Sequence, residues 1–511
     1  MKSRYYLTTP IYYVNGAPHI GHAYTSVAAD VLARWQRLDG HEVFFLTGTD
    51  EHGQKVEKAA EAAGVAPQLF ADRVAADFRD MADVMGISYD DFIRTTEPRH
   101  KDACAELWRR LEAGGHIYLG GYEGWYAVRD EAFYDEGELA TRPDGSRVGP
   151  SGAPVEWVRE PSYFFRLASF QERLLAHYDS NPDFIGPAAQ RNEITSFVRG
   201  GLRDLSISRT SFRWGVPVPG DPDHVMYVWL DALTNYLTAV GFPNEAAARW
   251  RFWPADLHLV GKDIARFHTV YWPAFLMAAG LPLPARVYSN GWWTMEGEKM
   301  SKSVGNVIDP RDLVREFGLD PVRFFLLREV PFGNDGDYSR RALISRLNVE
   351  LANDLGNLAQ RSLSLVAKNC AGRLPPRGPA TAEDVTFRDA AEALPGALRQ
   401  LLPQQAFGDA LEEVWRVIRA GNGYIDRQAP WTLRKTDLTR MGSVLRVLVD
   451  VLRVVATVLQ PFMPQSMARM LDQLGVDASA RDLAALAMPI ANGVVLPAPA
   501  GVFPRFDMEA A

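Results

Sequence analysis

Residues 5–53 constrain the fold of this chain more than any other stretch, because they predict a strand, a helix and a second strand in succession. Residues 5–9 have the aromatic and β-branched side chains of a short buried strand. Helical spacing of apolar residues begins at His19 and stops at Gly40, and residues 42–47 form a second apolar run. The stretch therefore predicts a β-α-β unit.

The tetrapeptide His19-Ile20-Gly21-His22 stands where this helix begins. Unpaired backbone N–H groups and the helix dipole make such a position favourable for a phosphate group. Two imidazoles there can also donate hydrogen bonds to a nucleotide phosphate. Histidines at a helix start can equally be simple caps, and the tetrapeptide alone leaves that alternative open.

A second motif, Lys299-Met300-Ser301-Lys302-Ser303, lies far downstream and follows a Glu-Gly-Glu turn at residues 296–298. Two lysines among serines are by themselves common in solvated loops. Between the two motifs, residues 256–290 predict another strand, helix and strand, with one helix over residues 264–279. Parallel strands joined by crossover helices predict a doubly wound sheet, which binds ligands at the carboxyl ends of its strands.

Both motifs in this order, with the second β-α-β unit between them, resemble the joint signature of class I aminoacyl-tRNA synthetases. Four further segments resemble methionyl-tRNA synthetases, in the bacterial type that lacks zinc ligands. The resemblance runs from about residue 4 to the helices beyond residue 431. The four segments are Pro10-Ile11-Tyr12-Tyr13-Val14-Asn15-Gly16, Gly48-Thr49-Asp50-Glu51-His52-Gly53, Tyr227-Val228-Trp229-Leu230-Asp231-Ala232 and Gly261-Lys262-Asp263-Ile264.

The resemblance implies an α/β fold: a doubly wound parallel-sheet (Rossmann-like) catalytic domain, split by a connective insertion and followed by an α-helical bundle that binds the anticodon. Apolar spacing independently predicts mostly helix over residues 54–115 and 163–199, and a bundle of long helices from residue 340 onward. The expected units are the catalytic domain at 1–115 and 225–293, the insertion at 116–224, the lysine loop and connecting unit at 294–340, and the anticodon-binding bundle at 341–511.

The family's activity is ligation of methionine to tRNA. L-Methionine is first activated with ATP, giving methionyl-adenylate and pyrophosphate, and the methionyl group then passes to the 3′ end of tRNA(Met), initiator tRNA included. The resemblance makes His19, His22, Lys299 and Lys302 the catalytic residues. Gly21, Gly261 and Asp263 join them in binding ATP, with Asp263 facing the ribose hydroxyls. Mg²⁺ is expected with ATP, held mainly by phosphates and water.

The resemblance also places a methionine pocket, in which Asp50 pairs with the α-ammonium group. Trp229, Ala232, Leu233 and Tyr236 share one helical face, because residues three, four or seven apart are neighbours on a helix. Ile264, His268 and Trp272 step by fours and share another. Such apolar stripes are more often ordinary core, and His268 within one is either a satisfied core histidine or a donor near the sulfur or Tyr236. The remaining pocket positions are Ile11, Tyr13, Trp229, Ala232, Leu233, Tyr236, Ile264, His268 and Trp272.

Three residues in the predicted bundle match the family's anticodon readers. Asn357 and Arg361 lie one turn apart on one helix, and Trp431 follows Pro430 at a helix break. Unstacked bases are held by aromatic stacking and by amide or guanidinium hydrogen bonds. Without the resemblance, Asn357 and Arg361 would be ordinary solvated residues and Trp431 ordinary core.

The connective insertion of some relatives contains a zinc knuckle, which needs four Cys or His ligands in paired spacing. Here the first pair's positions are Ala127 and Asp130, and the second pair falls at residues 149–151, which contain no Cys or His. The sequence therefore predicts no structural zinc and no metal ligands. The insertion is also too short to be the editing domain of the isoleucine, valine and leucine enzymes.

Composition limits the cellular setting rather than the activity. The 511 residues include only Cys104 and Cys370, which fits a reducing cytoplasm. The first residues lack the apolar core of a secretion signal, and the apolar run at 444–463 carries charges at helical intervals, so no membrane span is expected. The net charge of −8 neither supports nor excludes a nucleic acid partner. The chain lacks the extra C-terminal domain through which some relatives dimerise, so a monomer is expected.

Three alternatives are left open. A nucleotidylyltransferase shares the His-x-Gly-His element and the nucleotide fold, but does not need the helical bundle. A catalytically inactive paralogue that only binds tRNA would not need both histidines and both lysines. A synthetase for another apolar amino acid would share the class but not the pocket.

Overall fold

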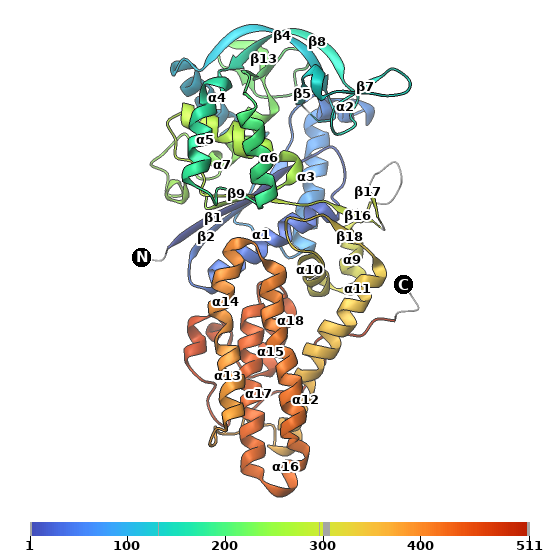
Figure 1. Ribbon diagram of the computed structural model, residues 1–511, viewed down its shortest axis with the longest axis vertical. Helices are drawn as coiled ribbons and strands as arrows, with labels where there is room; N and C mark the ends of the chain where they lie inside the picture. Colours follow the sequence, from blue (N-terminus) through green and yellow to red (C-terminus); the bar gives the residue numbers. More distant parts are fainter. Residues whose placement is uncertain (1–2, 131, 296, 300–306, 508–511) are drawn as a thin grey trace.

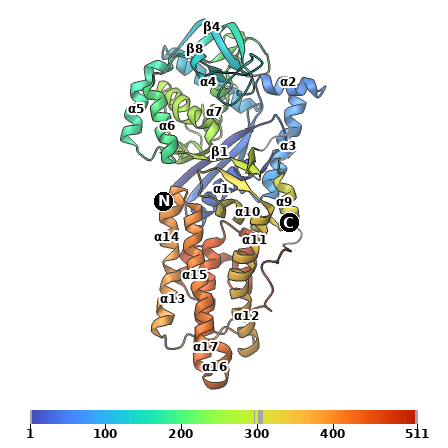
Figure 2. The ribbon, with the colours of Figure 1, turned by 45° about the vertical axis from the view of Figure 1, so that its right-hand side comes forward.

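The computed structural model describes residues 3–130, 132–295, 297–299 and 307–507. Three parts are stacked along the long axis of the molecule: the connective insertion, a central sheet with its helices, and a helical bundle (Figure 1 and Figure 2). This arrangement confirms the predicted fold class. Among the described residues, no helix is long and apolar enough to cross a membrane.

Six parallel strands form the central sheet, in the order β3-β2-β1-β14-β15-β9. Because the chain winds outward in both directions from the β1/β14 pair, the crevice at the carboxyl ends of these two strands is the natural ligand position. The strands are β1 (Arg4–Tyr13), β2 (Glu42–Asp50), β3 (Asp91–Arg94), β9 (Ile185–Gly186), β14 (Leu257–Gly261) and β15 (Val287–Asn290).

The first β-α-β unit confirms the prediction for residues 5–53. Helix α1 begins directly after its N-cap, His19, and stops before Gly40, which has a φ of +89°. The predicted helix at 54–115 is interrupted by β3, whose four residues are too few to give a strand period. The helices around the sheet are α1 (Ile20–Leu38), α2 (Gln54–Ala62), α3 (Pro67–Val84), α4 (Pro98–Ala113), α7 (Val228–Thr238) and α8 (Trp272–Ala278).

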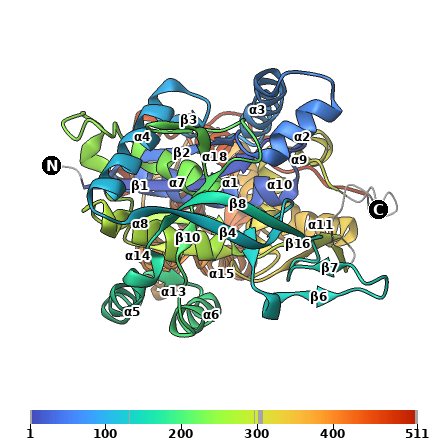
Figure 3. The same cartoon turned by 90° about the horizontal axis from the view of Figure 1, so that it is seen from above.

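The connective insertion is built on a long antiparallel ribbon that crosses the top of the molecule (Figure 3). The prediction of helix from residue 163 is wrong at its start, because residues 163–165 end the second strand of this ribbon and pair with residues 117–119. A short apolar run fits either period, and here strand pairing decides. The main elements are β4 (Ile117–Ala127), β5 (Ala132–Tyr134), β8 (Glu156–Phe165), α5 (Gln171–Ser180), α6 (Ala188–Arg199) and β10 (Leu205–Ser206).

Smaller sheets complete the insertion and the return to the central sheet. A hairpin of two short strands projects from the side of the insertion (Figure 3). Three strands in the order β11-β13-β12 then lead into α7. These elements are β6 (Ala140–Thr141), β7 (Arg147–Val148), β11 (Ser208–Arg209), β12 (Pro217–Val218) and β13 (Asp221–Met226).

A connecting unit and a bundle of helices follow the catalytic sheet. The prediction that residues from 340 onward are mostly helical is confirmed. The connecting unit comprises β16 (Trp293–Met295), β17 (Glu298–Lys299), α9 (Pro310–Phe317), α10 (Leu319–Arg328) and β18 (Gly336–Tyr338). The bundle comprises α11 (Arg340–Arg346), a π-helix (Leu347–Gly356), α12 (Asn357–Asn369), α13 (Ala382–Glu392), α14 (Leu394–Leu401), α15 (Phe407–Gln428), α16 (Pro430–Thr436), α17 (Leu438–Leu459) and α18 (Pro464–Gln473).

A buried ion pair joins the catalytic sheet to the bundle. Arg323 on α10 lies 2.7 Å from Asp30 on α1, and neither side chain is exposed. The same guanidinium donates to the backbone carbonyls of Met85, Pro461 and Phe462. Arg323 therefore holds together helix α1, the connecting unit and the segment that enters α18.

Candidate active site

The two signature histidines cap the start of α1 through their Nδ1 atoms. Nδ1 of His19 accepts from the backbone N–H of Gly21 at 3.1 Å, and Nδ1 of His22 accepts from the backbone N–H of His19 at 3.1 Å. Their ring centroids lie 3.8 Å apart. A nitrogen that accepts carries no proton, so the proton of each neutral ring is on Nε2. Capping thus orients two Nε2–H donors at a helix N-terminus.

Gly261 and Asp263 lie at the carboxyl end of β14, beside β1. A Cβ atom at position 261 would come within 2.5 Å of Oδ1 of Asp263, so a larger residue there would displace the Asp263 side chain. Asp263 is exposed, and its Oδ1 accepts from Nε1 of Trp292 at 3.4 Å. Lys299 ends β17, whose backbone pairs with β16, and Lys302 lies outside the described residues.

The carboxyl end of β2, where Asp50 is the last residue of the strand, is fixed by a buried network of charged groups. Asp50 is 2% exposed. Next to it, Glu51 receives two hydrogen bonds from the guanidinium of Arg94, at 2.6 and 2.9 Å. Nε1 of Trp214 donates to the Glu51 carbonyl at 2.5 Å. These bonds set the position of the strand end that presents Asp50.

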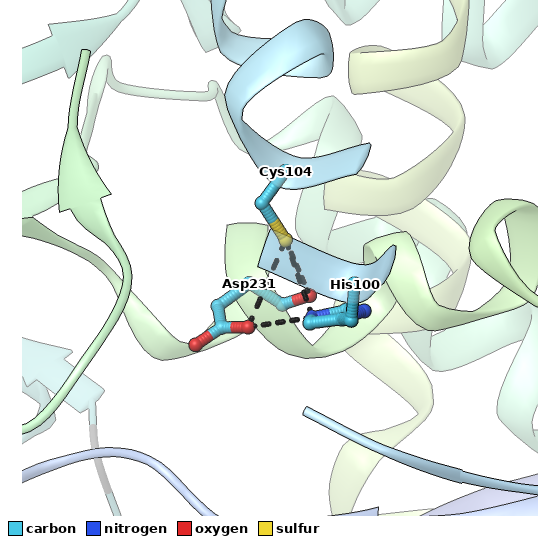
Figure 4. Close-up of side chains that lie close together, drawn as sticks. All are labelled: His100, Cys104 and Asp231. Atoms are coloured by element: carbon cyan, nitrogen blue, oxygen red, sulfur yellow. Dashed lines mark hydrogen bonds and ion pairs between the residues drawn. The ribbon is translucent and has the colours of Figure 1, made fainter. Parts of the chain in front are cut away.

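His52, two residues after Asp50, belongs to a second buried cluster, in which one carboxylate lies between two histidines. Asp231 on α7 lies 2.7 Å from Nδ1 of His52. It also lies 2.7 Å from Nε2 of His100, and Cys104 lies 3.2 Å from the same His100 nitrogen (Figure 4). These are hydrogen-bond distances, and the Cys104 thiol also donates to the backbone carbonyl of Asp231 at 3.7 Å. Although burial raises the pKa of Asp231, its two histidine partners outweigh that effect and lower it. The cluster joins α4 and α7 to the segment that follows the end of β2.

Aromatic rings gather along α7 and the helix that follows β14. The ring of Trp229 stacks on Phe267, with centroids 3.8 Å apart. The hydroxyl of Tyr236 lies 2.8 Å from Nε2 of His268, whose Nδ1 lies 3.0 Å from the Ile264 carbonyl. Because a carbonyl only accepts, Nδ1 carries the proton, and Nε2 accepts from Tyr236. His268 is therefore an acceptor from Tyr236, whereas the sequence had suggested a donor.

The predicted single helix at 264–279 is wrong in detail. Residues Lys262–Ile264 form a 3₁₀ turn, Phe267–Tyr271 a π-helix, and only then does α8 begin. The expected stepping by fours is therefore only approximate. The pocket residues that the sequence proposed divide by burial: Trp229, Ala232, Leu233, Tyr236, His268 and Trp272 are buried, and Ile11, Tyr13 and Ile264 are half-buried.

Stability should fall as pH drops from 6.5 toward 4, because burial lowers the pKa of His268 to about 4. The unfolded chain binds this proton near pH 6.5 and the folded chain does not, so stability rises with pH across that window. At pH 5.5, protonation of His268 in the unfolded chain lowers the free energy of unfolding by about 1.4 kcal/mol relative to its value at high pH. Urea unfolding of His268→Gln should show a correspondingly smaller loss between pH 7.5 and 5.5; an unchanged loss would contradict the neutral assignment.

Three residues near these sites were not found by sequence reasoning. His258 on β14 is fully buried, its ring centroid lies 4.2 Å from that of Tyr236, and its Nδ1 lies 2.8 Å from the Thr8 hydroxyl. Phe267 stacks on Trp229 from outside the helical spacing. Arg209 lies over the rings of Tyr126 and Tyr227. A histidine in a strand gives no periodic signal, and the partners of Arg209 are distant in sequence.

The predicted anticodon residues lie at the end of the bundle farthest from the insertion, where Figure 1 and Figure 2 show α16. Asn357 is exposed at the start of α12. The guanidinium of Arg361 lies 5.5 Å from the centre of the Trp431 ring and pairs with Asp426 at 2.5 Å. Trp431 is 41% exposed, so it is not core.

Hydrogen bonds occupy the place of the zinc knuckle. The Ser151 hydroxyl donates to Asp130, and Tyr134 donates to the same Asp130 oxygen at 2.9 Å. Arg129 donates to the Ser151 carbonyl at 2.7 Å and to its hydroxyl oxygen at 2.8 Å. Asp130 and Ser151 stand at the positions that the sequence aligned with one member of each ligand pair. These hydrogen bonds thus join the two halves of the knuckle.

A parallel sheet with two histidines at the first helix start, a lysine hairpin, and a helical bundle behind them is the layout of a class I aminoacyl-tRNA synthetase. A family model described as "tRNA synthetases class I (M)" matches residues 5–363. A second, described as "Anticodon binding domain of methionyl tRNA ligase", matches residues 375–510. The chain belongs to the methionyl-tRNA synthetase family.

Individual relatives agree over nearly the full length. The methionine–tRNA ligase of Brucella suis is 56% identical over 506 residues, which cover 99% of this chain and 98% of the relative. That of Mycobacterium leprae is 53% identical, over 98% of this chain and 95% of the relative. A solved structure of Mycobacterium tuberculosis methionyl-tRNA synthetase in complex with methionyl-adenylate has a TM-score of 0.97 and 53% identity, covering 99% of this chain and 100% of that one.

Full-length similarity of this degree defines the activity. The chain is an enzyme, a methionine–tRNA ligase, which activates L-methionine with ATP and transfers the methionyl group to tRNA. An inactive paralogue, a nucleotidylyltransferase and a synthetase for another amino acid are thereby set aside.

Proposed function

We propose that His19 and His22 bind the phosphates of ATP during methionine activation, while Lys299 and Lys302 close over the β- and γ-phosphates. The observation that carries this proposal is the capping by both Nδ1 atoms, which directs two Nε2–H donors to the helix N-terminus. The methionine carboxylate attacks the α-phosphate and pyrophosphate leaves. The residues align the two groups and stabilise the negative charge that spreads over the phosphates.

Asp263 is proposed to accept from the ribose hydroxyls, since it is exposed at the carboxyl end of β14. The Gly21 and Gly261 backbones lie close to the same ligand. ATP is expected to bring Mg²⁺ with it. Phosphate oxygens and water supply that ion's ligands, so the chain needs no dedicated carboxylate cage.

In the methionine pocket, Asp50 is proposed to pair with the α-ammonium group. The side chain of methionine is apolar with a polarisable sulfur, which packs well against aromatic edges. The stacked Trp229 and Phe267 rings and the Tyr236–His268 pair provide such edges. The remaining pocket residues are proposed to be Ile11, Tyr13, Ala232, Leu233, Ile264 and Trp272.

A panel of amino acids tests the residue assignments together. ATP–pyrophosphate exchange is measured with methionine, leucine, isoleucine, valine and cysteine, for the native protein and for Asp50→Asn. Exchange is expected with methionine alone, and the variant is expected to raise the KM for methionine about tenfold or more, since a bond to a charged group contributes roughly 1.5–3 kcal/mol. An unchanged KM would contradict the role of Asp50.

The bundle is proposed to read the anticodon of tRNA(Met), initiator tRNA included, through Asn357, Arg361 and Trp431. Replacing Trp431 with alanine should lower kcat/KM for tRNA by roughly 10–100-fold, because stacking a base on an aromatic ring contributes about 1–3 kcal/mol. Aminoacylation assays measure this loss, and exchange without tRNA should be unchanged. Leu438→Ala, on the neighbouring helix and 65% exposed, is the matched control. Equal effects of both variants would contradict base stacking.

The connective knuckle is proposed to be metal-free. Replacing Asp130 with alanine removes the carboxylate that both Ser151 and Tyr134 contact. Amide hydrogen exchange in residues 127–153 is expected to rise about tenfold or more, because two bonds to a charged group are lost and each contributes roughly 1.5–3 kcal/mol. Chelator treatment of the native protein should leave exchange in this segment unchanged. Faster exchange after chelation, with zinc found by elemental analysis, would contradict the proposal.

That the protein is a monomer and lies in the cytoplasm stays a prediction from the sequence. Light scattering coupled to size exclusion tests the first part, and cell fractionation the second.

A further inference from the structure

Two carboxylates at the start of β18 each contact one of the two segments proposed to bind ATP. It lies parallel to β16, with Thr294 opposite Asp337, and β16 in turn pairs with β17, which ends at Lys299. Asp337 lies within β18, and Asp335 directly precedes it. The two side chains are two residues apart and make separate sets of contacts.

Asp335 holds the segment that contains Asp263. Nζ of Lys262 donates to both Asp335 carboxylate oxygens at 2.7 Å, and the backbone N–H of Trp292 donates to Oδ1 at 2.8 Å. The same ammonium lies 4.1 Å from the centre of the Trp292 ring, and this ring's Nε1 donates to Asp263. Although burial raises the pKa of Asp335, these bonds outweigh it and lower the pKa.

The backbones are also close enough to require a glycine. A Cβ atom on Gly291 would come within 2.1 Å of the Asn334 carbonyl oxygen. The backbone N–H of Gly336 donates to the Trp292 carbonyl at 2.7 Å. The loop after β15 and the segment entering β18 are therefore fixed against each other by main-chain contacts as well as by Asp335.

Asp337 holds the base of the lysine loop. Its Oδ1 accepts from the Thr294 hydroxyl at 2.7 Å and from the backbone N–H of Gly297 at 2.9 Å. Gly297 has a φ of +81° and lies in the turn between β16 and β17. Both donors reach the same carboxylate oxygen, so the contact needs one acceptor at this position.

We propose that Asp335 and Asp337 are positioning residues for methionine activation: Asp335 fixes the ribose-binding turn, and Asp337 fixes the base of the lysine loop. Neither residue is assigned a contact with substrate. The inference rests on the proposed roles of Asp263, Lys299 and Lys302. Since β18 continues directly into α11 and then α12, both ATP-binding segments are fixed to the chain that leads to the anticodon residues.

The two carboxylates call for different substitutions. Asparagine at 335 keeps the shape but loses the charge and the second acceptor, so Asp335→Asn should raise the KM for ATP about tenfold, equivalent to about 1.4 kcal/mol. The KM for methionine should stay within about twofold, and that difference separates positioning of the ATP segment from general loss of structure. The assay is methionine-dependent ATP–pyrophosphate exchange.

At position 337 one oxygen suffices. Asp337→Ala should lower kcat for exchange about tenfold, while Asp337→Asn, which keeps Oδ1, should restore it to within about threefold of the native value. Asp312→Ala is the matched control, because Asp312 is a well-exposed carboxylate of the same connecting unit that pairs only with Arg315 among the described residues. Its kinetics should match those of the native protein.

Parallel variants separate failure of this inference from failure of the assigned roles. If Asp263→Ala and Lys302→Ala exchange at the native rate, the roles of those residues are wrong, and the inference falls with them. If those variants are impaired but Asp335→Asn and Asp337→Ala are native, only the positioning inference is overturned. Because Asp335 acts through Asp263, the double variant Asp263→Ala/Asp335→Asn should raise the KM for ATP no more than Asp263→Ala alone; additive effects would overturn it.

Discussion

Replacing His22 with alanine is expected to slow methionine activation by about 10²–10³-fold, the usual effect of removing one preorganised donor from developing negative charge. The ring packs edge-to-face against both Tyr12 and Phe78, with centroids 4.9 and 5.1 Å away. Its Nε2–H therefore needs no reorganisation when the phosphates rearrange. Single-turnover formation of methionyl-adenylate measures the chemical step directly.

A glutamine variant separates the donor from the cap. Both His22→Ala and His22→Gln lose the Nδ1 acceptor for the His19 N–H, but glutamine can place an amide N–H near the position of Nε2. His22→Gln should therefore be at least about tenfold faster than His22→Ala, a factor worth about 1.4 kcal/mol of activation free energy. Equal rates for the two variants would mean that His22 acts only as a cap.

Replacing Arg323 with alanine is expected to lower the free energy of unfolding by about 3–5 kcal/mol, because the buried Asp30 carboxylate loses its buried partner and keeps only the partly exposed Arg34. Ser88 donates two further bonds to Asp30, at 2.7 and 2.6 Å, which do not neutralise the charge. Chemical denaturation followed by fluorescence and by circular dichroism measures the loss.

Two controls test whether the loss of the buried partner charge is the cause. Arg34→Ala removes the other arginine that contacts Asp30, but that side chain is 29% exposed, so a loss of about 1 kcal/mol or less is expected. The double variant Asp30→Leu/Arg323→Met removes both buried charges and should recover part of the stability. If the double variant is no more stable than Arg323→Ala, the cost comes from packing and not from charge.

Much of the fold could be predicted from local patterns in the sequence. The β-α-β units, the end of α1 at Gly40 and the helices of the bundle each depend on spacing within a few residues, so the amino-acid sequence alone was enough to infer them. Residues 229, 232, 233 and 236 share one face of α7 for the same reason, because a helix of regular period presents them together. Their assignment to the methionine pocket came from the family resemblance and stays a prediction.

Features that depend on distant partners could not be predicted in this way. Asp231 lies 179 residues from His52 and 131 from His100, and no pattern joins them. The knuckle bonds of Asp130 were unreadable because serine, tyrosine and aspartate have no obligatory spacing, unlike zinc ligands. The prediction of helix at residues 163–165 was wrong for another reason. Their apolar run fits a helix and a strand equally, and the partner strand that favours the strand lies over 40 residues away.

The two π-helices set the rotational phase of the residues that follow them. Each residue of an α-helix advances the side-chain direction by about 100°, and a π-turn contains one residue more than an α-turn. Leu347–Gly356 stands directly before Asn357 and Arg361, and Phe267–Tyr271 directly before Trp272. Because each π-turn takes up its additional residue within one turn, the side chains that follow keep the direction they would have after an uninterrupted α-helix one residue shorter. If the same residues wound as an α-helix, the following side chains would be turned by about 100°. The directions of Asn357, Arg361 and Trp272, on which their proposed roles depend, are thus set by the backbone before them as well as by which residues are present.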